Sequence, residues 1–380
     1  MRHVLALKNL LEKHLNWHGS RITFLSLFII SMLQERTVNL TQISNGFATR
    51  GKKSGKIRRT EEFFAKFEID YDDIARLLSA FIENIGKWTL TMDRTNWKIG
   101  KVNINILYLA IAYKAVAIPL FWSLLQIEDE NGELYTKRGN SNTAERIAII
   151  DRFINVFGVE RIAVLTGDRE FVGKKWFEYL QEKGINFCIR EKKSKLINHK
   201  GKNIAIKSLF QGLKLGEYHH FGTIKIYGMD LHLTGSRMQD DYLIILSNYE
   251  AKKDEILLTY SKRWEIETMF KAFKSQGFNL EDTHLTKKDR IEKLLALMAI
   301  AFVWSYIAGE FFETIEPIKL KKKRGESVKH RAKSIFLHGL EYLKSILSAV
   351  HHKMDDFLEM VELFGMFLNR IEPRPKKVVS

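Results

Sequence analysis

Residues 88–190 alternate segments of strand character with segments of helix character, and this alternation restricts the possible folds more than any other feature of the chain. The runs "WTLTMDRT", "INILYLAIAY" and "VAIPLFWSLL" have strand length and are separated by short polar turns, which predicts a three-stranded meander. A helical pattern follows in "SNTAERIAIIDRFINVFG", and then come the strand "RIAVLTGD", a helix around "KKWFEYLQEKG" and the strand "INFCIR". The order β-β-β-α-β-α-β is that of a mixed α/β sheet.

The regions on either side of this core have a different character. Residues 1–85 are predicted to form a helical N-terminal region, and 86–190 the first part of the core. Residues 191–250 contain β-forming runs and turns without a convincing helix, as an inserted β subdomain would. Residues 251–310 return to helices as the second part of the core, and residues 311–380 are basic and helical.

The charge balance indicates a polyanionic partner. The 380 residues include 61 Lys and Arg against 45 Asp and Glu, a net charge of +16, which favours nucleic acid or an anionic membrane surface without choosing between them. Two basic segments stand out. The run "RGKKSGKIRR" is expected to be an exposed loop that contacts phosphates, and "KLKKKRGESVKHRAK", Lys319 to Lys333, is a second candidate. The cations assigned to DNA in the first run are Lys52, Lys53, Lys56, Arg58 and Arg59.

Neither a secretory signal nor a membrane helix is expected. "MRHVLALKNLLEKH" is interrupted by charge before any useful apolar run, and the uncharged stretch Leu294–Gly309 is shorter than the roughly 20 residues that a membrane helix needs. A buried helix is therefore predicted there. The single cysteine, Cys188, excludes an intramolecular disulfide and indicates a reducing compartment, for which we expect the cytoplasm.

The segment "YSKRWEIETMFKAFKS", residues 260–275, places acid and base close together. Projected as one continuous helix, a polar stripe forms beside the apolar stripe of Ile266, Met269, Phe270 and Phe273; it contains Tyr260, Arg263, Glu267, Lys271 and Lys274. Glu265 points away from both stripes and is predicted to be a solvated surface charge. Glu267 is thus the glutamate held among cations, unless the segment is only a salt-bridged helix surface.

Two aspartates add to this picture. Alternation in "TLTMDRTNW" puts Asp93 on the strand face opposite Leu90 and Met92, and Asp168 ends the apolar strand "RIAVLTGD". Each alone is compatible with a turn former or a satisfied polar residue, but the carboxyl ends of strands are where sites form in α/β sheets. With Glu267 they make an all-oxygen set suited to Mg²⁺, and two such ions can activate a water or a 3′-hydroxyl for phosphoryl displacement. Arg263, Lys271 and Lys274 would then hold the DNA backbone.

These residues carry a family resemblance. Tyr260, Arg263, Glu267 and Lys274 reproduce the pattern Y-x2-R-x3-E-x6-K, and with "MDRTNW" and "LTGDREF" the chain resembles DDE transposases of bacterial insertion sequences, in the insertion-sequence-four family. The resemblance implies a ribonuclease-H-like core with a β insertion before the third carboxylate. It implies Asp93, Asp168 and Glu267 as catalytic ligands of two Mg²⁺ ions, which Mn²⁺ can replace. Tyr260, Arg263 and Lys274 would contact transposon-end DNA.

The resemblance also implies a reaction and a setting. A homodimer on double-stranded DNA would bind the terminal inverted repeats, cut them and transfer the strands to target DNA by a cut-and-paste route, in the nucleoid of a prokaryote. "GNSNTAER", Gly139 to Arg146, resembles family sequence without an assigned role. Two alternatives stay open: a non-catalytic DNA-binding descendant, and a ribonuclease-H-like, structure-selective nuclease that does not join a 3′-hydroxyl to target DNA.

Overall fold

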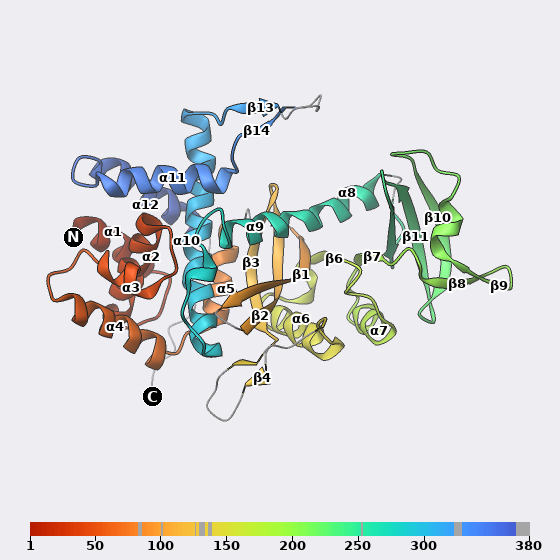
Figure 1. The fold of residues 1–380 in the computed structure, drawn as a ribbon, viewed down its shortest axis with the longest axis horizontal. Helices are drawn as coiled ribbons and strands as arrows, with labels where there is room; N and C mark the ends of the chain where they lie inside the picture. The colour runs from red at the N-terminus through yellow and green to blue at the C-terminus, as the bar shows by residue number, and fades with distance from the viewer. Residues whose placement is uncertain are drawn as a thin grey trace.

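The computed structural model describes residues 1–82, 86–99, 102–125, 127–128, 134–135, 139–251, 254–322 and 329–369. An eight-stranded mixed sheet lies at its centre, in the order β10-β11-β12-β7-β6-β1-β2-β3 (Figure 1). Its strands are β1 (Trp88–Ile99), β2 (Val102–Tyr113), β3 (Val116–Leu124), β6 (Ile162–Gly167), β7 (Phe187–Glu191), β10 (Tyr218–Ile226), β11 (Met229–Arg237) and β12 (Tyr242–Ser247).

The core of the sheet has the predicted order of elements. β1, β2 and β3 form an antiparallel meander, and β6 and β7 then join parallel to β1 and to each other. The connections are helices α6 (Thr143–Phe157) and α7 (Lys174–Glu182), and α6 begins in a capping box made by Asn142 and Glu145. The mixed α/β fold is therefore confirmed, and it is that of a ribonuclease-H-like core with three antiparallel and two parallel strands.

The predicted β insertion continues this sheet. Strand β12 pairs antiparallel with β7, and β11 and β10 follow it outward, at the right of Figure 1. Three further two-stranded pairs lie outside the sheet: β4 (Ile127–Glu128) with β5 (Leu134–Tyr135), β8 (Leu196–His199) with β9 (Lys202–Ala205), and β13 (Leu320–Lys322) with β14 (Lys329–Arg331). The chain returns from β12 through α8 (Glu255–Ser261) and α9 (Glu265–Phe273), and α9 packs on β1, β2 and β3.

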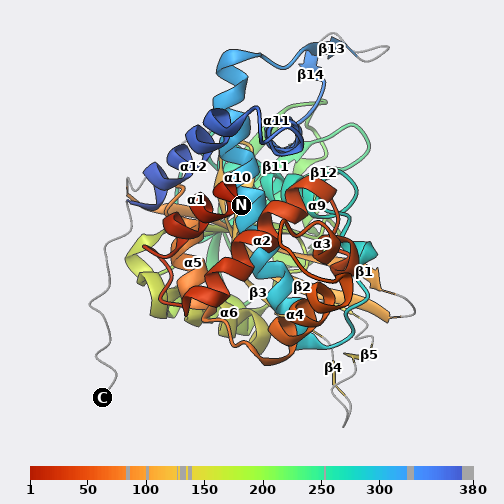
Figure 2. The same cartoon turned by 90° about the vertical axis from the view of Figure 1, so that its left-hand side faces the viewer.

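The N-terminal and C-terminal helices share one core around α10 (Lys288–Ile315), as Figure 2 shows from the helical end. Helices packed against α10 include α2 (Gly19–Glu35), α4 (Lys53–Lys66), α5 (Tyr71–Ser79), α11 (Ile335–Ser348) and α12 (Met354–Leu368), while α1 (Arg2–Leu11) packs on α2 and α12 and α3 (Leu40–Asn45) on α2 and α4. By length and composition α10 could cross a membrane, but its most apolar window is 89% buried inside the protein. The predicted buried helix at 294–309 is thereby confirmed.

The basic run Arg50–Arg59 is not wholly a loop, as the sequence predicted. Helix α4 begins at Lys53, so only the first residues of the run are irregular. The last turns of the helix bury Phe63 and Phe64, and the buried hydroxyl of Thr60 accepts a hydrogen bond from the hydroxyl of Ser44. These contacts stabilise the helix, which then extends back to Lys53. Lys52, Lys53 and Arg58 are nevertheless exposed.

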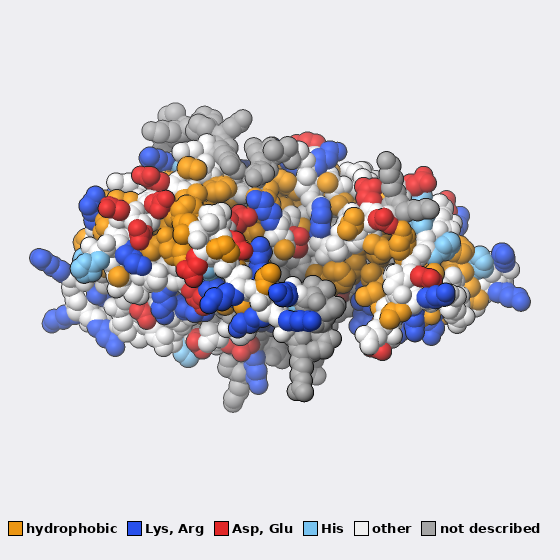
Figure 3. Space-filling model, turned by 90° about the horizontal axis from the view of Figure 1, so that it is seen from above, with side chains coloured by type: hydrophobic (Ala, Val, Ile, Leu, Met, Phe, Trp, Pro, Cys, Tyr) orange, Lys and Arg blue, Asp and Glu red, His pale blue; other side chains and the backbone are white. Residues whose placement is uncertain are grey.

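Basic side chains are spread over the surface. Figure 3 shows Lys and Arg at both ends of one face and near its middle, with acidic side chains between them. Since no single basic stripe dominates this face, a DNA-binding surface has to be argued from individual residues. The buried Cys188 contributes nothing to that surface, and burial raises the pKa of its thiol well above the ordinary value.

Candidate active site

Two aspartates meet where the parallel pairing of β1 with β6 ends. The pairing of β1 with β6 ends at Met92 opposite Gly167, so Asp93 in the middle of β1 and Asp168 directly after β6 lie side by side. The side chains of Leu90 and Met92 are buried in the core, as alternation along β1 requires. The sheet therefore brings together two of the three carboxylates that the sequence singled out.

Arg263 joins the third carboxylate to the first. Its guanidinium lies 3.2 Å from Oδ2 of Asp93 and 2.8 Å from Oε1 of Glu267, and only 9% of its side chain is exposed. A short 3₁₀ turn, η3 (Lys262–Trp264), carries Arg263 between α8 and α9 and points it at Asp93 in the middle of β1. A buried cation thus bridges two carboxylates that come from a strand and a helix.

The pKa of Asp93 is raised to about 7. Burial is the largest cause, and the charges of Asp168 and Glu267 add to it, whereas a hydrogen bond from the backbone N–H of Arg94 and the charge of Arg263 oppose it. Burial and the neighbouring carboxylates together therefore outweigh the charge of Arg263 at Asp93. Such a site favours an added cation.

We expect Asp93→Asn to stabilise the metal-free protein at about pH 8. Because the folded-state pKa lies above the unfolded one, the folded protein binds the proton more tightly, and the free energy of unfolding falls as the pH rises between the two values. The amide removes this cost, which is up to a few kcal/mol at about 1.4 kcal/mol per pKa unit. Thermal unfolding in a chelator should show a higher Tm for the variant at about pH 8 and a smaller gain at about pH 5.

An exposed residue supplies the control for that measurement. Asp240→Asn removes a carboxylate from the surface of the β insertion and should leave the Tm unchanged at both pH values. A lower Tm for Asp93→Asn at the higher pH would show that the bond to Arg263 outweighs the cost of burying the charge.

The other residues of the helical stripe are arranged differently from the prediction. The segment is not one continuous helix, because η3 interrupts it and α9 ends at Phe273. Tyr260 is buried, Lys271 is exposed, and Lys274 lies beyond the helix with its Nζ 5.6 Å from the ring centre of Trp97. The predicted single stripe is therefore wrong as geometry, since a 3₁₀ turn changes the angle between residues on its two sides.

Glu265 is not the solvated surface charge that the sequence predicted. Its Oε1 accepts a hydrogen bond from the backbone N–H of Ala115 at 3.2 Å, and burial raises the pKa of its carboxyl. Lys114 and Ala115 both have positive φ in the turn between β2 and β3, a conformation that costs about 1 kcal/mol or more for each such residue. The hydroxyl of Tyr306 donates to the carbonyl of Lys114, so Glu265 and Tyr306 hold this turn from two sides.

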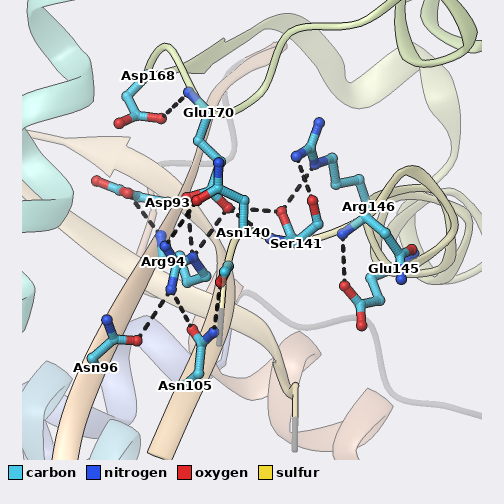
Figure 4. A network of polar contacts seen from close by, with 12 residues as sticks. Asp93, Arg94, Asn96, Asn105, Asn140, Ser141, Glu145, Arg146, Asp168 and Glu170 are labelled. Atoms are coloured by element: carbon cyan, nitrogen blue, oxygen red, sulfur yellow. Dashed lines mark hydrogen bonds and ion pairs between the residues drawn. The ribbon is translucent and has the colours of Figure 1, made fainter. Parts of the chain in front are cut away.

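A polar network behind the aspartates was missed by the sequence analysis (Figure 4). Arg94 Nε lies 3.1 and 3.0 Å from the two carboxylate oxygens of Glu170, and Glu170 accepts from the N–H and the hydroxyl of Ser141, each at 2.9 Å. Arg146 in turn donates to the hydroxyl and the carbonyl of Ser141. The available signal was a charged residue close after each aspartate, Arg94 in "MDRT" and Glu170 in "GDREF", the two being of opposite sign to each other.

The donor chemistry of the site fits a divalent cation. Asp93, Asp168 and Glu267 offer only oxygen atoms, which Mg²⁺ prefers, and the charges of Asp168 and Glu267 add to the burial that raises the pKa of Asp93. Across the described parts of the chain, however, no three His, Cys, Asp or Glu side chains are gathered closely enough to hold a metal ion. The guanidinium of Arg263 lies between two of the carboxylates and bonds both Asp93 and Glu267.

A known protein family matches part of the chain. Residues 132–304 match the family described as Transposase DDE domain. The matched range contains Asp168 and Glu267 together with the β insertion between them, and Asp93 lies N-terminal to it. No curated protein matches the chain.

Proposed function

We propose that the chain is a DDE transposase, an enzyme of phosphoryl transfer, because residues 132–304 match the family described as Transposase DDE domain. We further propose that it acts at the terminal inverted repeats of a bacterial insertion sequence of the insertion-sequence-four family. It would cleave the DNA strands there and transfer them to target DNA by a cut-and-paste route. The observation that carries this proposal is the meeting of Asp93 and Asp168 where the pairing of β1 with β6 ends, with Glu267 tied to Asp93 through Arg263.

We propose Asp93, Asp168 and Glu267 as the ligands of divalent metal, with Mg²⁺ as the physiological ion and Mn²⁺ as a substitute. When bound, two such ions would supply a nucleophile activated at neutral pH and charge stabilisation for the leaving oxygen. The carboxylates hold the charge that attracts the ions. The half-buried position of Asp93 limits access of bulk water to that charge.

Arg263 is proposed to exchange partners when DNA and metal bind. In this structure its guanidinium neutralises Asp93 and Glu267, and cations at these carboxylates would take over that function. A guanidinium released from carboxylates is suited to bidentate bonds with a phosphate. Lys271 is exposed for a second phosphate contact, Lys274 is partly buried beside Trp97, and Tyr260 packs under the site instead of facing solvent.

A cleavage and joining assay tests the function. The full chain is incubated with Mg²⁺ and linear DNA that carries the ends of the element encoding it, and with supercoiled target DNA. We expect cleavage at both ends and covalent joining of the freed 3′-hydroxyls to the target. Cleavage without joining would support a structure-selective nuclease, and binding without cleavage a non-catalytic descendant.

The exposed cations at the start of α4 are proposed to bind terminal DNA. Lys52, Lys53 and Arg58 are exposed, whereas Lys56 donates to the carbonyl of Phe47 at 2.7 Å and Arg59 to that of Ser20 at 3.4 Å. Lys56 and Arg59 thus have bonds within the protein, which DNA would have to replace. All five residues remain candidates for the interface, with the exposed three as the stronger ones.

Replacing Lys52, Lys53 and Arg58 with Ala should weaken binding of terminal DNA and lower the slope of log Kd against log salt by about one for each lost phosphate contact. The full chain is required, because the N-terminal helices share their core with α10 and α12. Lys56→Ala with Arg59→Ala is the comparison, for which a lower Tm is the main expected change. An unchanged slope in the triple variant would move end binding to the exposed strands β13 and β14, whose connecting residues 323–328 lie outside the described residues.

We also propose that the enzyme works as a homodimer on double-stranded DNA in the nucleoid of a prokaryotic cytoplasm. The basic charge of the chain supports the DNA partner. The burial of α10 inside the protein supports the absence of a membrane partner.

A further inference from the structure

We propose that the Arg94–Glu170 ion pair, supported by the segment Gly139–Arg146, sets the spacing between Asp93 and Asp168 and so determines how tightly the site binds divalent metal. Arg94 and Glu170 are positioning residues in this proposal, because their side chains act through the aspartates. The inference rests on the proposed function, in which the two aspartates are metal ligands.

The backbone alone does not hold the two aspartates together. The hydrogen-bonded ladder between β1 and β6 ends at Met92 and Gly167, one residue before each aspartate. Strand β1 continues to Ile99 in its pairing with β2, but after Gly167 the chain leaves the sheet in a turn closed by a bond from Phe171 N–H to the carbonyl of Asp168. Asp168 therefore lies where the two segments are free to separate.

The ion pair spans the point where the ladder stops. Arg94 follows Asp93 directly, and its backbone N–H donates to Oδ1 of Asp93 at 2.7 Å. Glu170 lies two residues after Asp168, and its backbone N–H donates to Oδ1 of Asp168 at 2.8 Å. Each aspartate is thus oriented by the backbone of one member of the pair, and the two side chains join across 3.0 Å.

Both side chains of the pair are largely buried and make further hydrogen bonds to the protein. They are 16% and 10% exposed, and Arg94 also bonds Asn105 at 2.9 Å and Asn140 at 3.4 Å. Such a pair exchanges its partners less readily than a surface salt bridge, and breaking it would leave a partly buried charge without its counter-ion. The pair is therefore suited to fix a distance.

The segment Gly139–Arg146 explains why Glu170 stays in place. Ser141 donates to Glu170 through both its backbone N–H and its hydroxyl, and Arg146 holds Ser141 in position. Arg146 is itself only 5% exposed, and its Cζ lies 5.2 Å from the ring centre of Phe171. The capping box of Asn142 and Glu145 anchors the segment to the first turn of α6. The "GNSNTAER" sequence thus has a physical role, because it holds Glu170 in place for its ion pair with Arg94.

The geometry predicts a graded effect on metal binding. Groups that orient metal ligands typically change metal affinity or activity by about 10- to 100-fold when they are replaced. Glu170→Gln keeps the shape of the side chain and removes its charge, and Arg94→Lys keeps the charge and removes the planar fork. Each should weaken Mn²⁺ binding by about 10-fold or more, and the double variant by less than the product of the two, because the same pair is broken.

Titration calorimetry with Mn²⁺ alone on the full chain, free of DNA, tests this directly. The control is Glu178→Gln, which removes the same charge from an exposed pair with Lys174 on α7 and should bind Mn²⁺ like wild type. Ser141→Ala provides a milder variant that keeps both charges and should give an intermediate loss. The Tm of every variant is measured at the same time.

Variants with a lower Tm and wild-type Mn²⁺ affinity would overturn the inference, because the pair would then be purely structural. A wild-type chain that binds no Mn²⁺ would overturn it together with the metal assignment. A chain that binds Mn²⁺ with the expected ranking of variants, yet neither cuts nor joins DNA, would support the inference and contradict the proposed function. The two failures are thus distinguishable.

Discussion

Replacing Asp93, Asp168 or Glu267 with the corresponding amide is expected to lower DNA strand cleavage by about 1,000-fold or more, because bound metal supplies several kcal/mol of transition-state stabilisation. Binding of terminal DNA should be retained or become tighter, since each amide removes a negative charge beside the proposed phosphate path. Cleavage is measured on end-labelled DNA in Mg²⁺, and binding is measured on the same DNA in a chelator. Loss of cleavage with retained binding is the expected signature of a metal ligand.

The control for this series has to be chosen from the structure. Glu265 is two residues from Glu267, but it bonds the backbone of Ala115, so Glu265→Ala should destabilise the turn between β2 and β3. Glu178→Gln, on the exposed side of α7, is the neutral carboxylate change. Cleavage by Glu267→Gln at a rate close to that of wild type would remove the central claim about the site.

The largest expected effect on stability is at Gly339 in α11. A Cβ there would lie 1.9 Å from the carbonyl oxygen of Ser305 and 2.3 Å from the backbone nitrogen of Gly309, both in α10. These are backbone atoms that no rotamer change can move. We expect Gly339→Ala to lower the free energy of unfolding by about 3 kcal/mol or more, at the upper end of the cost of overpacking, or to prevent folding.

A second glycine provides the matched control. Gly55 lies inside α4, and a Cβ there meets nothing within 4 Å. Gly55→Ala should therefore raise stability by up to about 1 kcal/mol through helix propensity alone. Denaturant unfolding of both variants gives the comparison, and a Gly339→Ala protein as stable as wild type would show that α10 and α11 can separate at little cost.

Much of the fold followed from local patterns. Alternation along residues 88–125 predicted the meander, and helical periodicity at 141–158 predicted the first crossover. Both succeeded because the spacing of apolar side chains that indicates a strand or a helix is visible within a few neighbouring residues. The sequence-based prediction was wrong at the start of α4, where a basic run that contains a glycine indicated a loop. There the burial of Phe63 and Phe64 favours a helix that propensity alone does not predict.

Local sequence patterns were enough to place Asp93 on a strand, Asp168 after a strand and Glu267 on a helix, since each placement depends on a period or a boundary within a few residues. The partners of these side chains, in contrast, depend on how distant parts of the chain pack together. Arg263 reaches Asp93 across 170 positions of the chain, Glu265 reaches Ala115 across 150, and Arg94 reaches Glu170 across 76. Such contacts depend on strand register and on the packing of α9 against the sheet, and no local pattern in the sequence contains either.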